Sequence, residues 1–497
     1  MESQDIHPSE PQDENIIKNK ELTVGAALIP VIVLVIMLFY NVLYAFEDAA
    51  LDGSNQFILL MGAAVAAVVG FFHKVRFEQM LEEVSQNIKS TAGAILILLM
   101  VGALAGTWLV SGIIPTMIYY GLQILNPTIF LVSTVVICSI VSLATGSSWT
   151  TSATVGIALI GIAEALQVPL GMTAGAIVSG AYFGDKLSPL SDTTNLAPAM
   201  AGTDLFTHIR YMLYTTIPTY TVTLIVFIVL GLSLDVSGQA ETSALLNSLK
   251  SSITISPWLF VIPGLVIFLI IKKTSPLIAL FLGTLFGALA AVFFQPELIA
   301  ALGGEQTLTF HSGYKGVMNA ITVESIIPTD NEALRGLFSS GGMVGMLNTI
   351  WLILCAMVFG GVMDAIGALA TISKALLKLF HTTFGLFAST VASCLALNVT
   401  ASDQYLALVI PGKMYAQAFR DKNLAPENLS RTLEDSGTVT STLIPWNTCG
   451  AYQSGVLGVP TTHYAVYAVF NWLSPFMTLL FAAFKIKIRE LKTPHNN

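Results

Sequence analysis

The chain has 497 residues, of which 54% are hydrophobic and only 10% are charged. A soluble domain carries about 25% charged residues, so the composition excludes an ordinary soluble protein. The formal net charge of −8 argues against a nucleic-acid partner. No two of the four cysteines have CxxC spacing and no two histidines form an HxxxH pair, so the sequence favours neither a zinc site nor a disulfide framework.

Apolar runs of the length of a membrane span recur along the chain. They occupy residues 23–46, 90–111, 208–233, 256–271, 276–295, 345–363 and 462–484. About 20 apolar residues cross the hydrocarbon core as a helix, and backbone groups in lipid must be bonded internally, so the runs predict helices. The polar residues 1–22 predict a disordered tail. We therefore expect an all-α polytopic membrane protein in contact with lipid.

Basic residues mark the loops that we expect on the cytoplasmic side of an inner (plasma) membrane. They occur in the N-terminal tail, in a loop at 73–89 and after residue 484, whereas residues 111–127 and 456–461 have none. The alternation fits about ten spans plus two hairpins, with both termini cytoplasmic. The expected division is a tail at 1–22, a first span and loop at 23–56, a first repeat at 57–255, a second repeat at 256–485 and a tail at 486–497.

The two halves of the chain resemble each other at a nearly constant offset. Matched pairs 255 positions apart are Gly106 and Gly361, Gly112 and Gly367, Thr145 and Thr400, and Ser147 and Ser402. Five expected spans separate the starts of the repeats, and this odd number gives the repeats opposite orientations. Inverted repeats are typical of secondary transporters, because two mirror-related halves supply the inward-open and outward-open states.

Four polar segments interrupt the apolar runs. Residues 184–195 and 434–450 break two helices, because Pro189 and Pro445 disfavour helix before them. Residues 145–152 and 398–404 each separate two apolar arms of roughly 13 to 16 residues, which are short for spans. We read these two segments as the tips of re-entrant hairpins near the membrane midplane, where irregular backbone is tolerated only inside protein or beside water.

Hydroxyls, freed carbonyls and carboxylates in these interruptions are hard oxygen ligands that suit a small cation. Serine and threonine in membrane helices also bond their own backbone, which is the simpler reading for any one of them. The candidate ion-binding residues of the first half are Thr145, Ser147, Ser148, Thr150, Asp185, Ser191, Asp192, Thr193, Thr194 and Asn195. Those of the second half are Thr400, Ser402, Asp403, Asp435, Asn447 and Thr448.

The carboxylates point to exchange, since ionisable groups inside a membrane mark ion or proton pathways. An aspartate holds a proton or a cation but not both, which suffices for antiport. We expect one dominant sodium site in the first half, and Asp403 as a proton carrier or second cation ligand. Lys186 is expected to pair with the adjacent Asp185 or to take part in proton coupling. Trp149 is a candidate contact for an organic substrate, with packing as the equal alternative.

The stretch Gly184-Asp-Lys-Leu-Ser-Pro-Leu-Ser-Asp-Thr-Thr-Asn-Leu-Ala-Pro198 resembles the signature of NhaC-type sodium/proton antiporters. Thr145-Gly-Ser-Ser-Trp-Thr-Thr-Ser152 and Ser436-Gly-Thr-Val-Thr-Ser-Thr-Leu-Ile-Pro-Trp-Asn447 resemble the same family, which belongs to the broad ion transporter superfamily. The resemblance implies two hairpins, two unwound helices that hold the coupling ion with the hairpin tips, and an elevator-like motion. The family is also similar to malate/lactate exchangers and sodium-coupled amino-acid carriers.

The predicted function is therefore the exchange of sodium for protons across the inner membrane. The alternative is a sodium- or proton-coupled carrier or exchanger of a small organic anion or an amino acid, although no arginine lies in any interruption to clamp a carboxylate. No HExxH or GxSxG constellation occurs, so an enzyme is not expected. We expect sodium and protons as coupling ions and no cofactor, and a homodimer is left open.

Overall fold

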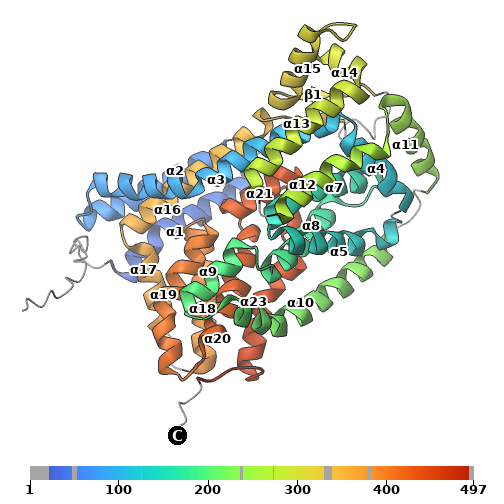
Figure 1. Cartoon of the computed structure of the whole chain (residues 1–497). Coiled ribbons are helices and arrows are strands. Elements are labelled where there is room, and N and C mark those ends of the chain that lie inside the picture. The colour runs from blue at the N-terminus through green and yellow to red at the C-terminus, as the bar shows by residue number, and fades with distance from the viewer. Residues whose placement is uncertain are drawn as a thin grey trace, which may run out of the picture.

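The computed structural model describes residues 22–46, 53–124, 126–234, 239–272, 274–329, 338–378 and 382–491 (Figure 1). Within these ranges the chain is mostly helical, and its one sheet is the antiparallel pair of β1 (Ser325–Ile326) and β2 (Ser339–Ser340). The predicted class of a helical membrane protein is confirmed. The predicted disordered tail falls, apart from Leu22, outside the described residues.

Seven helices in the described ranges are long and apolar enough to cross a bilayer. They are α2 (Ser54–Phe72), α3 (Phe77–Val110), α5 (Pro127–Thr145), α10 (Leu205–Ser233), α13 (Pro276–Phe294), η6 with α16 (Val344–Met346 and Leu347–Ala365) and α18 (Thr383–Thr400). The end of α11 (Gln239–Ser252) and the pair η4 (Pro257–Phe260) and α12 (Val261–Ile271) form an eighth if the 88° bend between them lies within one span.

Three further apolar helices are shorter, with 10 to 17 residues: α1 (Val24–Tyr40), α4 (Ile113–Ile124) and α23 (Val469–Ala483). The remaining elements before β1 are η1 (Asn41–Ala45), α6 (Ser148–Thr151), η3 (Ser152–Gly156), α7 (Ile157–Ala165), α8 (Leu170–Leu187), α9 (Asp192–Ala201), α14 (Pro296–Leu302) and α15 (Phe310–Thr322). Those after β2 are α17 (Ala368–Lys378), α19 (Gln404–Asp421), α20 (Pro426–Leu433), η7 (Glu434–Thr438), η8 (Ser441–Leu443), α21 (Thr448–Leu457) and α22 (Thr461–Tyr464).

Several predicted boundaries are wrong. The expected loop at 73–89 is largely helix, because α3 begins at Phe77 with a capping box in which the Gln79 side chain accepts from the Arg76 backbone. The arms α5 and α18 have 19 and 18 residues and reach the tips. At the end of α18 the Thr400 hydroxyl bonds the carbonyl of Ala396, and the helix continues to Thr400 itself.

The apolar run at 462–484 is also not one helix. Helix α22 ends at Tyr464 and α23 begins at Val469. The turn between them packs on α8, where a Cβ on Gly175 would lie 2.4 Å from the Cβ of Tyr467. A continuous helix would not bring the backbone of this turn so close to α8.

The two halves of the chain interleave around the interruptions. Helix α9, from the first half, packs against α19 and α20 from the second half, and α10 packs against α23 (Figure 1). Helices α14 and α15 project at one end of the molecule, and α19 and α20 lie at the opposite end near the C-terminus (Figure 1). The broken helices are thus enclosed by protein, as irregular backbone at membrane depth requires.

Helices α5 and α8 approach closely because glycine faces α5 along α8. A Cβ on Gly180 would lie 2.3 Å from the carbonyl oxygen of Val135, and a Cβ on Gly184 would lie 2.5 Å from the backbone nitrogen of Leu143. The Ser142 hydroxyl donates across this contact to the carbonyl of Ala181 at 2.5 Å. Small residues and interhelical hydroxyl bonds are the usual means of joining helices in lipid. This contact sets the position of the first tip relative to the first break.

Replacement of Gly180 by alanine tests this contact. We expect Gly180→Ala to destabilise the protein by about 1–3 kcal/mol, because the new methyl group overlaps a carbonyl oxygen that cannot move freely. The midpoint of thermal unfolding in detergent is the measurement. Gly264→Ala on α12 is the control, since a Cβ there meets nothing within 4 Å. Equal midpoints for the two variants would contradict the close packing.

Candidate functional site

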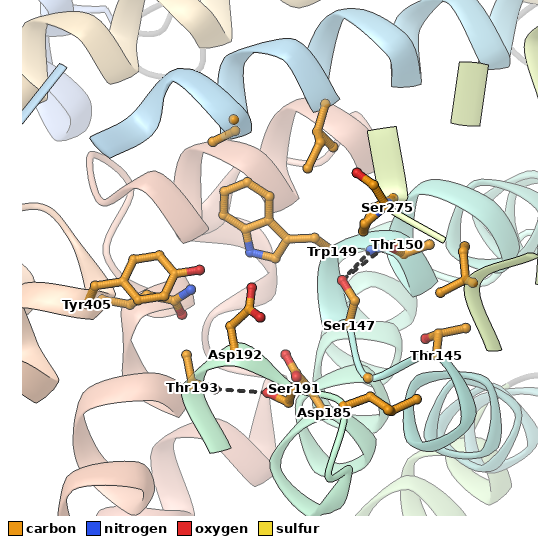
Figure 2. Close-up of a pocket in the computed structure, with 18 of the residues that line it drawn as sticks. Thr145, Ser147, Trp149, Thr150, Asp185, Ser191, Asp192, Thr193, Ser275 and Tyr405 are labelled. Atoms are coloured by element: carbon orange, nitrogen blue, oxygen red, sulfur yellow. Dashed lines mark hydrogen bonds between the residues drawn. The ribbon is translucent and has the colours of Figure 1, made fainter. Parts of the chain in front are cut away.

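A cavity of about 540 Å³ lies where the first tip meets the first break (Figure 2). Its polar lining combines hydroxyls, carboxylates and freed backbone from both interruptions. The polar side chains that line it are Ser90, Thr145, Ser147, Trp149, Thr150, Asp185, Ser191, Asp192, Thr193, Thr274, Ser275, Gln404 and Tyr405. No lysine, arginine or histidine is among the described lining residues, so the cavity has a negative character.

The first tip is a reversal between two helix ends. Helix α5 ends at Thr145, and Gly146 turns the chain in the left-handed region with φ of 70°. Ser147 then caps α6, since its hydroxyl accepts from the Thr150 backbone N–H at 3.1 Å. The carbonyl end of α5 and the N–H end of α6 therefore lie side by side at the cavity, and the former offers oxygen atoms to a cation.

The first break leaves only residues 188–191 outside helix. Ser191 caps α9 by accepting from the Thr194 N–H at 3.4 Å, and the Thr194 hydroxyl bonds the carbonyls of Asp185 and Lys186 at the end of α8. The Asn195 amide donates to the carbonyls of Pro189 and Ser191 at 3.0 and 2.7 Å. Thr194 and Asn195, two candidate ligands, thus stabilise the break, and neither lines the cavity.

The two carboxylates of the cavity have different surroundings. One oxygen of Asp185 accepts from the backbone N–H and the hydroxyl of Ser148, at 3.1 and 2.7 Å, so the tip and α8 are tied together. Asp192 is exposed to the cavity at the start of α9 and points toward its centre (Figure 2). No hydrogen bond or ion pair joins its carboxylate to another described residue, which leaves it free for a ligand.

Trp149 packs against a second aromatic ring and also lines the cavity, so its role as a contact for an organic substrate stays a prediction. Its ring stacks on Tyr452, with centroids 4.0 Å apart and planes 19° apart, and the Tyr452 hydroxyl donates to its carbonyl at 3.0 Å. The ring also lines the cavity, where Figure 2 shows it above Asp192. Its indole N–H is buried and has no hydrogen-bond partner among the described residues.

The expected pairing of Lys186 with Asp185 is wrong. The Lys186 ammonium instead forms an ion pair with Asp435 of η7, and both side chains are fully buried. The second oxygen of Asp435 accepts from the hydroxyls of Thr215 on α10 and Thr478 on α23. Adjacent side chains on a helix point in different directions, so the Lys186 side chain points away from Asp185 and contacts the other half of the chain. Asp435 belongs to this buried pair and does not line the cavity.

The second tip and the second break also meet, at a cluster of their own. Asp403 caps α19 by accepting from the N–H groups of Tyr405 and Leu406, at 2.8 and 3.1 Å. Asn447 caps α21 and donates to the carbonyl of Asn398 at 3.0 Å, and the Thr448 N–H donates to the carbonyl of Ser402 at 3.0 Å. These residues and Thr400 do not line the cavity, although Gln404 and Tyr405 do.

Sequence reasoning missed several residues of the site. Gln404 is the last residue of the second tip and Tyr405 follows it, so the sequence indicated their position, but the turn at Thr274 and Ser275 carried no such signal. Glu434 was also missed, although it lies within the second break. Its side chain is fully buried and accepts from the Thr193 hydroxyl at 3.1 Å. A charged residue in a polar break of a membrane chain was the available signal.

The sequence is similar to those of known ion antiporters. The sequence profile of the Na+/H+ antiporter family matches residues 180–486. The Na(+)/H(+) antiporter NhaC of Alkalihalophilus pseudofirmus is 38% identical over 85% of this chain and 88% of its own. The malate-2H(+)/Na(+)-lactate antiporter of Bacillus subtilis is 37% identical over 89% and 91%. The arginine/ornithine antiporter ArcD of Halobacterium salinarum is 31% identical over 96% of each chain.

The free carboxylate of Asp192 yields a prediction about cation binding. Addition of sodium is expected to raise the thermal unfolding midpoint of the native protein, and Asp192→Asn is expected to abolish this increase because it removes the unpaired charge in the cavity. Asp403→Asn is the matched control, since asparagine caps a helix about as well as aspartate. Loss of the sodium effect in Asp403→Asn with its retention in Asp192→Asn would place the cation in the second half.

The buried pair yields a second prediction. Lys186→Met is expected to destabilise the protein by roughly 3–5 kcal/mol, because the Asp435 carboxylate then stays buried without its cation. The pair of Arg489 and Glu427 is the comparison, because Arg489 is 48% exposed while Glu427 is 6% exposed, and Arg489→Met is expected to cost less than Lys186→Met since water reaches this pair. Unfolding midpoints in detergent compare the two. Equal losses would show that the fully buried pair contributes no more than a partly exposed pair.

Proposed function

Because the chain belongs to the Na+/H+ antiporter family, we propose that it exchanges sodium for protons at the cavity between its first tip and first break. The single observation that carries the placement is the free carboxylate of Asp192 in a cavity without a basic side chain. Asp185 adds a second carboxylate, one oxygen of which is already held by Ser148. A cation neutralises charge there, and an anion would meet repulsion.

The ligand chemistry of the cavity suits sodium. Hard cations take oxygen ligands, and in broken-helix transporters sodium is held by unwound carbonyls and helix C-terminal ends. The end of α5 at Thr145 and the hydroxyls of Ser147, Thr150 and Ser191 line the cavity together with Asp192. We assign the sodium ion to this set.

Helix boundaries support the proposal that the two halves are inverted repeats. The helix caps Asn126 and Thr382, and again Ser191 and Asn447, lie 256 positions apart. The left-handed glycines that end α9 and α21, Gly202 and Gly458, lie 256 positions apart as well. Equivalent turns thus recur at nearly the offset that the sequence matches have. In opposite orientations, two such halves would supply the inward-open and outward-open states of an exchanger.

A second candidate function is the exchange of a small organic anion together with cations. The similarity to a malate/lactate antiporter favours it, and so does a cavity of about 540 Å³, which exceeds what one bare ion fills. Since the described lining has two carboxylates and no basic side chain, an organic anion would need bound sodium to offset the charge. Sodium binding is therefore common to both candidate functions.

Vesicles that contain the purified protein and an internal pH dye test the exchange. Sodium added outside is expected to drive protons out, so the interior becomes alkaline, and reversal of the sodium gradient is expected to reverse the change. Potassium and choline serve as controls for the cation. Absence of proton movement in both directions without organic solutes, and its appearance only when malate or lactate is present, would favour the second candidate.

A further inference from the structure

We propose that Glu434 carries the exchanged proton at a position separate from the cation cavity, and that Thr193 couples the two sites. This inference rests on the sodium/proton exchange proposed above and deepens it. It concerns a carboxylate that does not line the cavity but touches one of its lining residues.

Glu434 is a buried carboxylate with an unused oxygen. Its side chain is 0% exposed in the π-helix η7, and Oε1 accepts from the Thr193 hydroxyl at 3.1 Å. Oε2 has no hydrogen-bond partner among the described residues. An ionised carboxylate in such surroundings carries a high desolvation cost, and a bound proton removes it. The site is therefore suited to a group that cycles between the two forms.

The charges around Glu434 leave it without a cation of its own. Lys186 of α8 is taken by Asp435, whose other oxygen is bonded by two hydroxyls. The Arg431 guanidinium of α20 lies over the Tyr211 ring of α10, 4.6 Å from its centre. The other titratable or charged groups on α8, α9, α10, α19 and α20 are Tyr182, Asp185, Asp192, His208, Arg210, Tyr214, Tyr220, Tyr405, Lys413, Tyr415, Arg420, Asp421 and Glu427, and α18 and α23 carry no charged residue.

Three of those groups have partners other than Glu434. Glu427 pairs with Arg489, and Asp185 is held by Ser148. His208 contacts the Ser430 hydroxyl through Nδ1 at 2.8 Å. Hence the hydroxyl of Thr193 is the one hydrogen-bond donor to the Glu434 carboxylate among the described residues, with the Thr438 hydroxyl close by.

Thr193 connects this carboxylate to the cavity. Thr193 lines the cavity, its hydroxyl lies 3.2 Å from the Ser191 hydroxyl, and it donates its proton to Glu434. A cation that binds the Ser191 oxygen directs the Ser191 proton to the Thr193 oxygen, so the Thr193 proton stays pointed at Glu434 and stabilises its ionised form. When the cation leaves, a proton can bind Glu434, which then donates to the Thr193 oxygen. One proton leaves as one sodium ion enters, so the charge of the two sites together is unchanged.

Asp403, which the sequence predicted to be a proton carrier or a second cation ligand, has a different set of contacts. Its Oδ1 accepts from two backbone N–H groups at the start of α19, which favour the ionised form at a helix N-terminus. Among the described residues it bonds no residue that lines the sodium cavity other than its near chain neighbour Tyr405. Glu434, which accepts from a lining hydroxyl, is better placed for exchange.

Proton release on sodium binding tests the assignment. Sodium chloride is added to the full-length protein in weakly buffered detergent solution that contains a pH dye. Choline chloride is the control for ionic strength. The native protein is expected to release protons. Glu434→Gln is expected to keep the sodium-dependent rise in unfolding midpoint and to lose the proton release. Glu427→Gln, on the preceding helix α20, is expected to behave like the native protein.

Further variants keep the result decisive if Glu434→Gln does not fold. Glu434→Asp is expected to retain proton release, and Thr193→Val is expected to keep sodium stabilisation while the release falls at least several-fold. Thr193→Ser is expected to restore it. Unchanged release in Glu434→Gln or in Thr193→Val overturns the proposal, and loss of release in Asp403→Asn alone assigns the proton to Asp403. Sodium binding without any proton release in the native protein contradicts the exchange itself.

Discussion

Unpaired backbone groups and charges cannot face hydrocarbon, and this constraint governs the arrangement of the whole chain. Where helices stop at the first tip and the first break, the side chains of Ser147, Ser191 and Asn195 satisfy the backbone. Where carboxylates occur, they are turned toward hydroxyls, a lysine or the cavity. The apolar helices around them keep these groups away from lipid, so the same arrangement that permits the broken helices also encloses the cation site.

The interactions that join the two halves come from the polar interruptions themselves. Lys186 of the first break pairs with Asp435 of the second, and Thr193 bonds Glu434. Both contacts link α8 or α9 to η7, so a change in charge at one break alters the electrostatic interactions of the side chains at the other. In a low dielectric such contacts are strong when complete and costly when broken. This gives the site a physical basis for coupling one bound ion to another.

Much of this organisation could be predicted from sequence patterns, because polar segments within apolar runs must be enclosed by protein or lie beside water in a membrane. The patterns located both tips and both breaks, and the meeting of Thr145–Ser152 with residues 184–195 is what the structure shows. The partner of Lys186 could not be predicted, since Asp435 lies 249 positions away and spacing along one helix does not reveal it. The extent of α3 was hidden by its charged first turns, which continue the helix beyond the apolar run.

The cavity wall contributed by Ser90 and Ser275 could not be predicted for a related reason, because it depends on where α3 and the residue before α13 lie around the cavity. The central claim, that sodium occupies this cavity, is tested most directly by high-resolution structures of the protein with and without sodium. We predict a difference density between Asp192 and the first tip, with oxygen ligands around it. Density only at the second tip, beside Asp403 and Asn447, would contradict the account.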